Sequence, residues 1–176
     1  MRQTQYGETA FSRFFFSNTK VSILWLVVRL YVGYEWLMAG YEKMINPVWW
    51  GNNAGAALSG YLQGALAKTT GLHPDVQGWY ATFLHDTILP NVFVMSHVVA
   101  LGEVLVGVAL IAGFLVGVSA FFGAFMNLNF LLAGTVSINP TLFVLGILLM
   151  LAWRTAGYIG LDYYILPRFF GSSKRR

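Results

Sequence analysis

The stretch from Val21 to Met44 constrains the fold of this chain more than any other part of the sequence. It is a long apolar run, and a helix of about 20 residues is enough to cross the hydrocarbon core of a bilayer. Arg29 and Glu35 nevertheless lie well inside it. Because a charged side chain that faces lipid is energetically costly, we expect both of these side chains to face protein or water.

One side of this stretch carries small and polar residues. Steps of four and three residues keep to one face of a helix, and here they connect Arg29, Gly33, Trp36, Gly40 and Lys43. Small residues let two helix backbones approach closely, and polar side chains form hydrogen bonds between helices in a membrane. This face is therefore predicted to pack against partner helices.

The composition is that of a helical membrane protein. The length of 176 residues corresponds to a single domain, 1–176, in which 57% of the residues are hydrophobic and 10% are charged. The mean hydropathy of +0.61 is too high for a soluble domain. The chain has no cysteine, so it cannot by itself ligate an iron–sulfur cluster or form a zinc–thiolate site. Any redox chemistry would need a borrowed cofactor.

Further apolar stretches follow the first one, and the sequence predicts an all-α, polytopic membrane protein. We expect a bundle of four transmembrane helices, whose spans cover about 22–44, 91–113, 115–136 and 141–162. The longer segment 45–90 contains two stretches with apolar residues at helical spacing. These stretches predict two short helices that form an outer cap between the first and second spans.

The net charge of +4 comes largely from the ends of the chain. Arg13 and Lys20 precede the first span, and 174–176 are all basic. Cytoplasmic segments of membrane proteins are enriched in Lys and Arg, so we expect the chain in the cell membrane with both termini in the cytoplasm. The same distribution favours membrane lipid, and not nucleic acid, as the partner of this positive charge.

Charged residues of three spans are predicted to lie at one depth. With a rise of ~1.5 Å per residue, Arg29 and Arg154 lie roughly 12 Å, and Glu103 about 15 Å, from the cytoplasmic ends of their spans. Two arginines around one glutamate leave a surplus positive charge, which is costly in a low-dielectric place. A quinone carbonyl, a lipid phosphate, a small oxoanion or Asp162 would balance it. The alternative is an internally satisfied cluster that only holds the helices together.

Other polar side chains complete the predicted site. Glu35 and His97 each lie about 9 Å from the outer ends of their spans, and carboxylates and imidazoles relay protons in membranes, so they are the candidate catalytic residues. Asn127 and the flat ring of Trp36 are further candidates for binding a substrate or a quinone. A haem between membrane helices commonly needs two histidines and only His97 lies in a span, so neither haem nor a metal is expected.

Three motifs resemble, in order, those of the DoxX/DoxD-like membrane protein family. RLYVGYEWLMAGYEKMINPVW resembles the opening signature at Arg29, Gly33, Gly40, Lys43 and Pro47. GEVLVGVALIAG resembles the signature of the second span at Glu103, Gly107 and Gly113. GYIGLDYY resembles the closing signature at Gly160 and Asp162. The similarity covers about residues 22 to 165.

The resemblance implies a four-helix membrane bundle. For the DoxD branch it implies the membrane subunit of a thiosulfate:quinone oxidoreductase, with quinone as the cofactor and a small redox subunit as a partner. A non-enzymatic membrane assembly partner, or a component that transports a small molecule or anion, is the alternative function. Gly33, Gly40 and Gly123 would serve a homo-oligomer as readily as internal packing.

Overall fold

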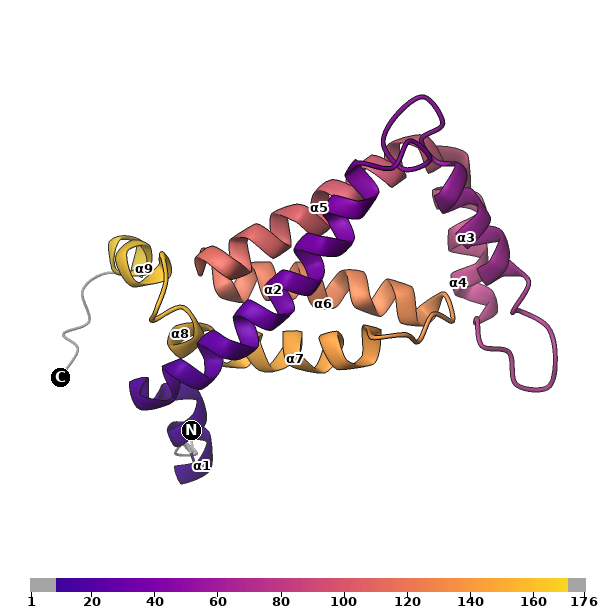
Figure 1. The fold of residues 1–176 in the computed structure, drawn as a ribbon. Coiled ribbons are helices and arrows are strands. Elements are labelled where there is room, and N and C mark those ends of the chain that lie inside the picture. Colours follow the sequence, from indigo (N-terminus) through magenta and orange to yellow (C-terminus); the bar gives the residue numbers. More distant parts are fainter. Residues whose placement is uncertain (1–8, 171–176) are drawn as a thin grey trace.

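A computed structural model describes residues 9–170, which are all-helical and contain no strand, as the sequence predicts. Figure 1 shows α2 and α5 as two long helices side by side, with α6 and α7 beneath them. In chain order the helices are α1 (Ala10–Ser17), α2 (Ser22–Met44), α3 (Ala56–Leu66), α4 (Gly78–Phe83), α5 (Val92–Ala112), α6 (Val116–Leu132), α7 (Asn139–Leu151), α8 (Trp153–Ala156) and α9 (Asp162–Phe170).

Glycines bring the antiparallel helices α2 and α5 into backbone contact. A Cβ atom at Gly33 would lie 2.9 Å from Ile111 Cγ1, and one at Gly40 would lie 2.7 Å from the backbone nitrogen of Val104. On the opposing helix, a Cβ atom at Gly107 would lie 2.5 Å from the backbone nitrogen of Leu37. The face of α2 that carries the small and polar residues is therefore the face that packs on α5.

The main core lies between this pair and a second antiparallel pair, α6 and α7. Gly146 on α7 packs against Ala124 of α6, where an added Cβ atom would lie 3.3 Å from the alanine Cβ. The buried apolar side chains of the core come from all four helices and from α8: Trp25, Val32, Trp36, Val106, Leu110, Val116, Ala120, Leu142, Leu149, Ala152 and Ala156.

Helix α5 begins at Val92, one residue from the start of the predicted second span, but this is not the start of a separate helix. The helical run is continuous from Gly78 to Ala112, through a π-helical turn, Leu84–Ile88, and a 3₁₀ turn, Leu89–Asn91. A proline has no N–H to donate, and such irregular turns accommodate that loss. The run bends there, so α4 packs with α3 as a cap around a second small core (Figure 1).

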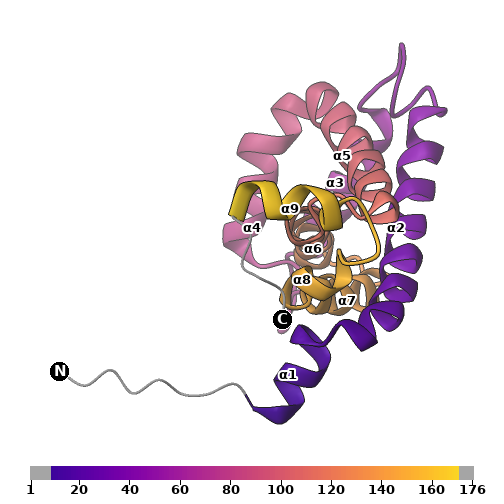
Figure 2. The ribbon, with the colours of Figure 1, turned by 90° about the vertical axis from the view of Figure 1, so that its left-hand side faces the viewer.

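The fourth predicted span, 141–162, is interrupted. Helix α7 ends at Leu151, the single turn of α8 follows, and α9 starts a new direction at Asp162. Together with α1, these two short helices gather at the end of the bundle where α2 begins, which faces the viewer in Figure 2.

Two helical segments of the described residues, Thr19–Met44 and Gly78–Ala112, are long and apolar enough to cross a membrane. The helices Val116–Leu132 and Asn139–Leu151 are apolar but shorter. In the most apolar part of each long segment, 33% of the residues are buried inside the protein. The remainder of these apolar surfaces faces outward.

Candidate functional site

The three charged residues predicted to share one pocket lie apart. Glu103 pairs with Lys43, whose Nζ lies 2.7 Å from Glu103 Oε2. Arg154 is exposed, and its guanidinium carbon lies 5.0 Å from the ring centroid of Trp153. Arg29 turns toward the opposite end of the bundle from Lys43. The prediction of a common chamber for Arg29, Glu103 and Arg154 is therefore wrong.

The direction of side chains on a helix explains this result. Side chains lean toward the N-terminus of their own helix. Arg29 therefore reaches away from Glu103, to the turns that contain Gly113 and Gly160. Lys43 leans back from the last turn of α2, which brings its ammonium group to Glu103. The predicted depths followed backbone positions and ignored the length of these two side chains.

Arg29 joins two turns at the end of the bundle where α2 begins. Its two terminal nitrogens donate to the backbone oxygens of Ala156, at 3.1 Å, and Ile159, at 2.7 Å. A Cβ atom at Gly160 would lie 2.6 Å from Arg29 Nη1, and Gly113 has as little room. Arg29 therefore satisfies carbonyl groups where α8 ends and no further helical turn follows.

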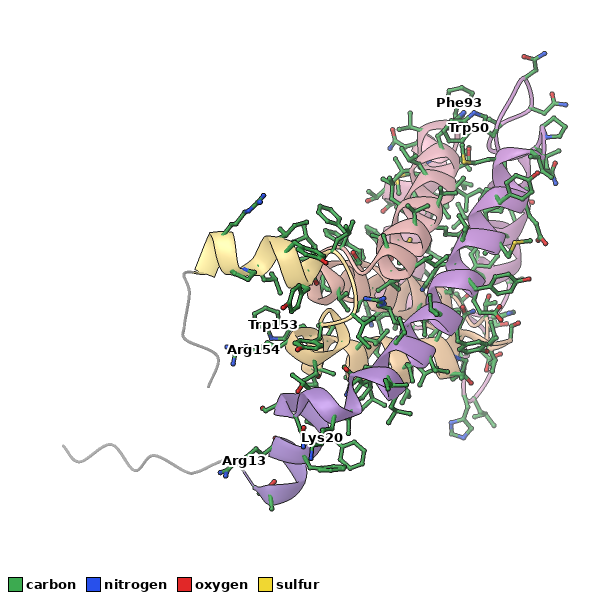
Figure 3. The ribbon with its side chains drawn as sticks, turned by 60° about the vertical axis from the view of Figure 1, so that its left-hand side comes forward. Arg13, Lys20, Trp50, Phe93, Trp153 and Arg154 are labelled. Atoms are coloured by element: carbon green, nitrogen blue, oxygen red, sulfur yellow. The ribbon has the colours of Figure 1, made fainter. Side chains whose placement is uncertain are left out.

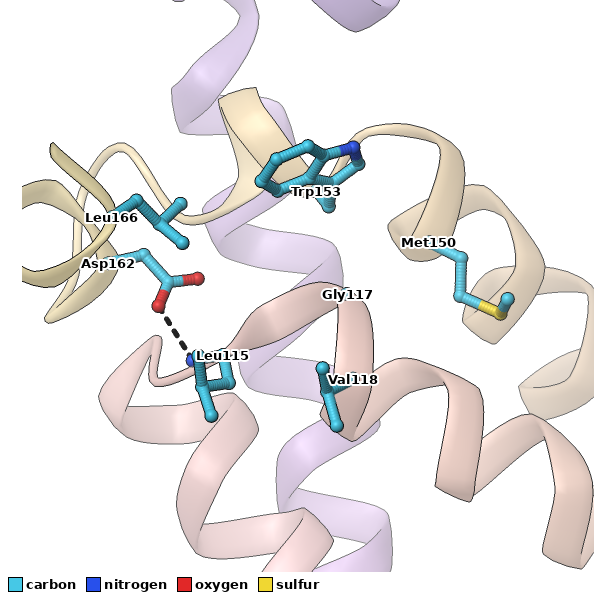
Figure 4. Close-up of a pocket in the computed structure, with 7 residues that line it drawn as sticks. All are labelled: Leu115, Gly117, Val118, Met150, Trp153, Asp162 and Leu166. Atoms are coloured by element: carbon cyan, nitrogen blue, oxygen red, sulfur yellow. Dashed lines mark hydrogen bonds between the residues drawn. The ribbon is translucent and has the colours of Figure 1, made fainter. Parts of the chain in front are cut away.

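Asp162 supplies a negative charge beside Arg29. Its side chain is 2% exposed. The carboxylate accepts hydrogen bonds from the backbone N–H groups of Leu115, at 2.6 Å (Figure 4), and Val116, at 2.9 Å, which caps the N-terminus of α6. It also attracts Arg29 electrostatically. We call Arg29, Gly113, Gly160 and Asp162 the Arg29 cluster; of the groups considered for balancing a surplus positive charge, Asp162 is the one that lies here.

The Lys43–Glu103 pair joins α2 and α5 near the C-terminal end of α2. The Glu103 side chain is 1% exposed, whereas that of Lys43 is 21% exposed. Lys43 Nζ donates to Glu103 Oε1 at 3.0 Å. Glu103 Oε2 lies within ion-pair distance of the same nitrogen but takes no hydrogen bond from the described part of the chain. Both oxygens of the buried carboxylate therefore lie against the Lys43 ammonium group.

Asn127 is buried at about the same height along the bundle as this pair. It is 0% exposed, and neither its amide nitrogen nor its amide oxygen has a hydrogen-bond partner among residues 9–170. The residue before it, Met126, packs on Gly102, which precedes Glu103. Asn127 is therefore level with Glu103, across the α5–α6 contact. An unsatisfied buried polar group costs about 1–3 kcal/mol, and it calls for an explanation such as a bound molecule or water.

Trp36 completes this level of the bundle. Its indole Nε1 lies against Gly123, where a Cβ atom would approach it to 2.9 Å, and Gly123 is one helical turn before Asn127. The indole is 3% exposed. We call Trp36, Lys43, Glu103 and Asn127 the Glu103 layer, which joins α2, α5 and α6.

Glu35 and His97 do not form the predicted relay. Leu37 packs on Gly107, so Glu35 lies near that level of α5, whereas His97 is about ten residues, or roughly 15 Å of helix, away. His97 Nδ1 lies 2.8 Å from the backbone oxygen of Phe93. Its ring contacts those of Phe93 and Trp50 at centroid distances of 4.9 and 4.6 Å; both are labelled in Figure 3. The prediction failed because α5 continues past the end of α2.

The sequence predicted Lys43 only as a motif position, and its pairing with Glu103 was missed. The available signal was its place on the same stripe as Gly40, which packs at the level of Glu103. No known protein family, curated protein or solved structure matches this chain.

Proposed function

We propose that this chain is a multi-pass protein of the cell membrane, in which α2, α5, α6 and the combined α7–α8 segment are the four spans. Large apolar side chains point outward from each of the four: Val27 is 61% exposed, Val98 53%, Phe122 53% and Val144 54%. A core helix of a soluble protein would be mostly buried, whereas 33% of the most apolar part of each long helix is buried here. Outward apolar surface on this scale fits a lipid environment.

The basic residues support the orientation with both termini in the cytoplasm. Lys20, Arg154 and Arg168 are exposed and belong to the end of the bundle where α2 begins and where α8 and α9 lie (Figures 1 and 3). Cytoplasmic ends of membrane helices carry such an excess of Lys and Arg. The α3–α4 cap then lies on the outer side.

Within this membrane protein, the Glu103 layer is the proposed binding site for the head group of a quinone. Asn127, fully buried with both amide atoms unpartnered, is the observation that carries the proposal. An amide nitrogen donates to a quinone carbonyl, and an amide oxygen accepts from a quinol hydroxyl, so one asparagine serves both redox states. Lys43 adds a second donor, and Glu103, which is ion-paired with it, adds a second acceptor.

The DoxX/DoxD resemblance suggests the reaction in which this quinone site would take part. Its motif residues divide between the two polar clusters: Arg29, Gly113, Gly160 and Asp162 form one, and Lys43 and Glu103 belong to the other. The chain is then a quinone-reactive membrane subunit linked to the oxidation of thiosulfate or another sulfur compound, which works with a small redox subunit. In this proposal Arg29 and Asp162 support the fold, and Arg154 has no part in quinone binding.

A different observation favours the non-enzymatic alternative. Gly33, Gly40 and Gly107 bring α2 and α5 into backbone contact, which leaves no room for a ligand between those two helices. If the Glu103 layer only joins helices, the chain is an assembly partner or a transport component. The two functions differ in whether quinone binding depends on Asn127.

The decisive experiment measures quinone binding and quinone-dependent thiosulfate oxidation in purified protein, alone and with its membrane partners. Asn127→Leu replaces the amide by an apolar group of similar size. We expect it to weaken quinone binding about tenfold, as the loss of one or two buried hydrogen bonds would. The matched control is Asn129→Leu, because the Asn129 amide already accepts from Tyr80 and donates to the Phe125 carbonyl. Unchanged binding in Asn127→Leu would remove the Glu103 layer from the mechanism.

A further inference from the structure

A groove lies at the same end of the bundle as the Arg29 cluster. Its volume is about 300 Å³, and it is lined by residues of α6, α7, α8 and α9. Figure 4 shows the side chains of Val118, Met150, Trp153 and Leu166 around it, with Gly117 on its floor. Its polar lining residue is Asp162, whose carboxylate is already engaged by two backbone N–H groups. The groove therefore suits an apolar occupant.

Two sets of contacts fix the positions of the helices that form the walls of the groove. A Cβ atom at Gly117 would lie 3.0 Å from Trp153 Cβ, so the glycine lets α8 approach α6 at this level. The first turn of α9 is fastened to the α5–α6 turn by backbone hydrogen bonds from Asp162 to Gly113, at 2.8 Å, and from Leu161 to Ala112, at 3.1 Å. Leu166, one turn later, forms the wall that faces Trp153 and Val118.

Positive charge lies at the rim of the groove. The Trp153 ring lines the groove, and the guanidinium of Arg154 lies 5.0 Å from the centroid of that ring. Figure 3 shows Arg154 at the same end of the bundle as Lys20. A tryptophan with neighbouring basic side chains is the usual anchor at the polar boundary of a membrane.

We propose that this groove binds an anionic phospholipid of the cytoplasmic leaflet, with one acyl chain between α6 and α9 and the phosphate at Arg154. The apolar lining accounts for the chain, and the basic rim accounts for the preference for an anionic head group. Exposed Val118 continues into the apolar surface of Phe121 and Phe122 on α6, which extends the path for the chain. The inference rests on the proposed membrane location and is independent of quinone.

The test uses the full-length protein in detergent, with native mass spectrometry to count bound phosphatidylglycerol and phosphatidylcholine at equal concentrations. Val118→Trp fills the groove from an exposed position, and Val144→Trp, at an equally exposed position on α7, is its control. Arg154→Gln removes the charge at the rim, and Lys20→Gln removes a charge elsewhere at the same end. Size-exclusion chromatography checks that each variant is folded.

We expect the wild type to retain phosphatidylglycerol in preference to phosphatidylcholine. Arg154→Gln and Val118→Trp should each lower phosphatidylglycerol binding about fivefold, the effect of one basic contact at a membrane surface, while both controls bind as the wild type does. Equal losses in Arg154→Gln and Lys20→Gln, or full binding in Val118→Trp, would overturn the proposal, as would displacement of the lipid by inorganic phosphate. Recovery of the chain in the soluble fraction of cells would instead contradict the membrane location itself.

Discussion

The two buried polar clusters of this protein differ in how completely their groups are satisfied. In the Arg29 cluster, Arg29 donates to two carbonyls and Asp162 accepts from two N–H groups, which leaves Arg29 Nε as the buried atom without a partner. In the Glu103 layer, the side-chain amide of Asn127 makes no hydrogen bond within the described residues. Buried charge that is paired with backbone holds turns together, whereas a buried amide without partners is suited to a ligand.

The clusters also differ in where their partners come from. Arg29 and Asp162 bind mostly backbone groups of chain turns, so their geometry depends on where helices end. Lys43 and Glu103 bind each other across two helices. Substitutions in the Arg29 cluster should therefore damage the fold first, and substitutions in the Glu103 layer should damage binding first.

The largest effect is expected for Arg29→Met. The variant removes the cation that faces the buried Asp162 carboxylate and leaves the carbonyls of Ala156 and Ile159 uncapped, and each buried polar group left without a partner costs about 1–3 kcal/mol. We expect a large drop in the thermal unfolding temperature in detergent, or no folded protein. Arg154→Met, in which an exposed arginine is lost, should stay within about 0.5 kcal/mol of the wild type. Equal stability of the two variants would show that the Arg29 cluster does not hold the fold.

A smaller loss is expected for Lys43→Met. Glu103 then remains buried without its partner, but the cost should be about 2 kcal/mol and below that of a fully buried pair, because the Lys43 side chain is 21% exposed. Adding Glu103→Leu should recover most of the stability, since it removes the unpaired charge. A double-mutant cycle measures this coupling, and additive losses would mean that the pair contributes nothing in the folded protein.

Asn127→Leu separates the two clusters most sharply. It removes two unsatisfied buried groups, so the free energy of unfolding should stay the same or rise by about 1 kcal/mol, while quinone binding falls. Chemical unfolding and quinone titration on the same preparation provide both values. A large loss of stability would place Asn127 with the structural groups of the Arg29 cluster instead.

The smallest effects are expected for Glu35→Gln and His97→Gln. Neither side chain belongs to either cluster, so both variants should stay within about 0.5 kcal/mol of wild-type stability and should keep quinone binding and turnover. The turnover assay with thiosulfate as donor checks this expectation. A proton-transfer defect in both variants would instead support the predicted Glu35–His97 relay.

The sequence predicted the helical class, the face of α2 that packs on α5, and the inward position of Arg29 and Glu103. These features follow from local periodicity and from the cost of burying charge, which any backbone arrangement must respect. The sequence also predicted Glu103, Asn127 and Trp36 as residues of a binding site. Their common level was not predicted, because it depends on the contacts Gly102–Met126 and Gly123–Trp36.

Helix ends were the weakest part of the prediction. The second span was expected to start at 91 as a separate helix, yet irregular turns around Pro90 keep the helical run continuous from Gly78. The fourth span was expected to reach Asp162, yet α8 ends where Arg29 binds its carbonyls. In both places a distant or compensating interaction outweighs the local signal, and such interactions are invisible in a window of sequence.

The amino-acid sequence alone determined that Arg29 and Glu103 must turn inward, because a charged side chain on an apolar outer surface is energetically costly. Only the tertiary structure decided which partners they meet. Long side chains reach a full helical turn from their backbone positions. The offset between the helices therefore decides that Arg29 faces Asp162 and that Glu103 pairs with Lys43. The glycines that bring α2 and α5 into contact set that offset.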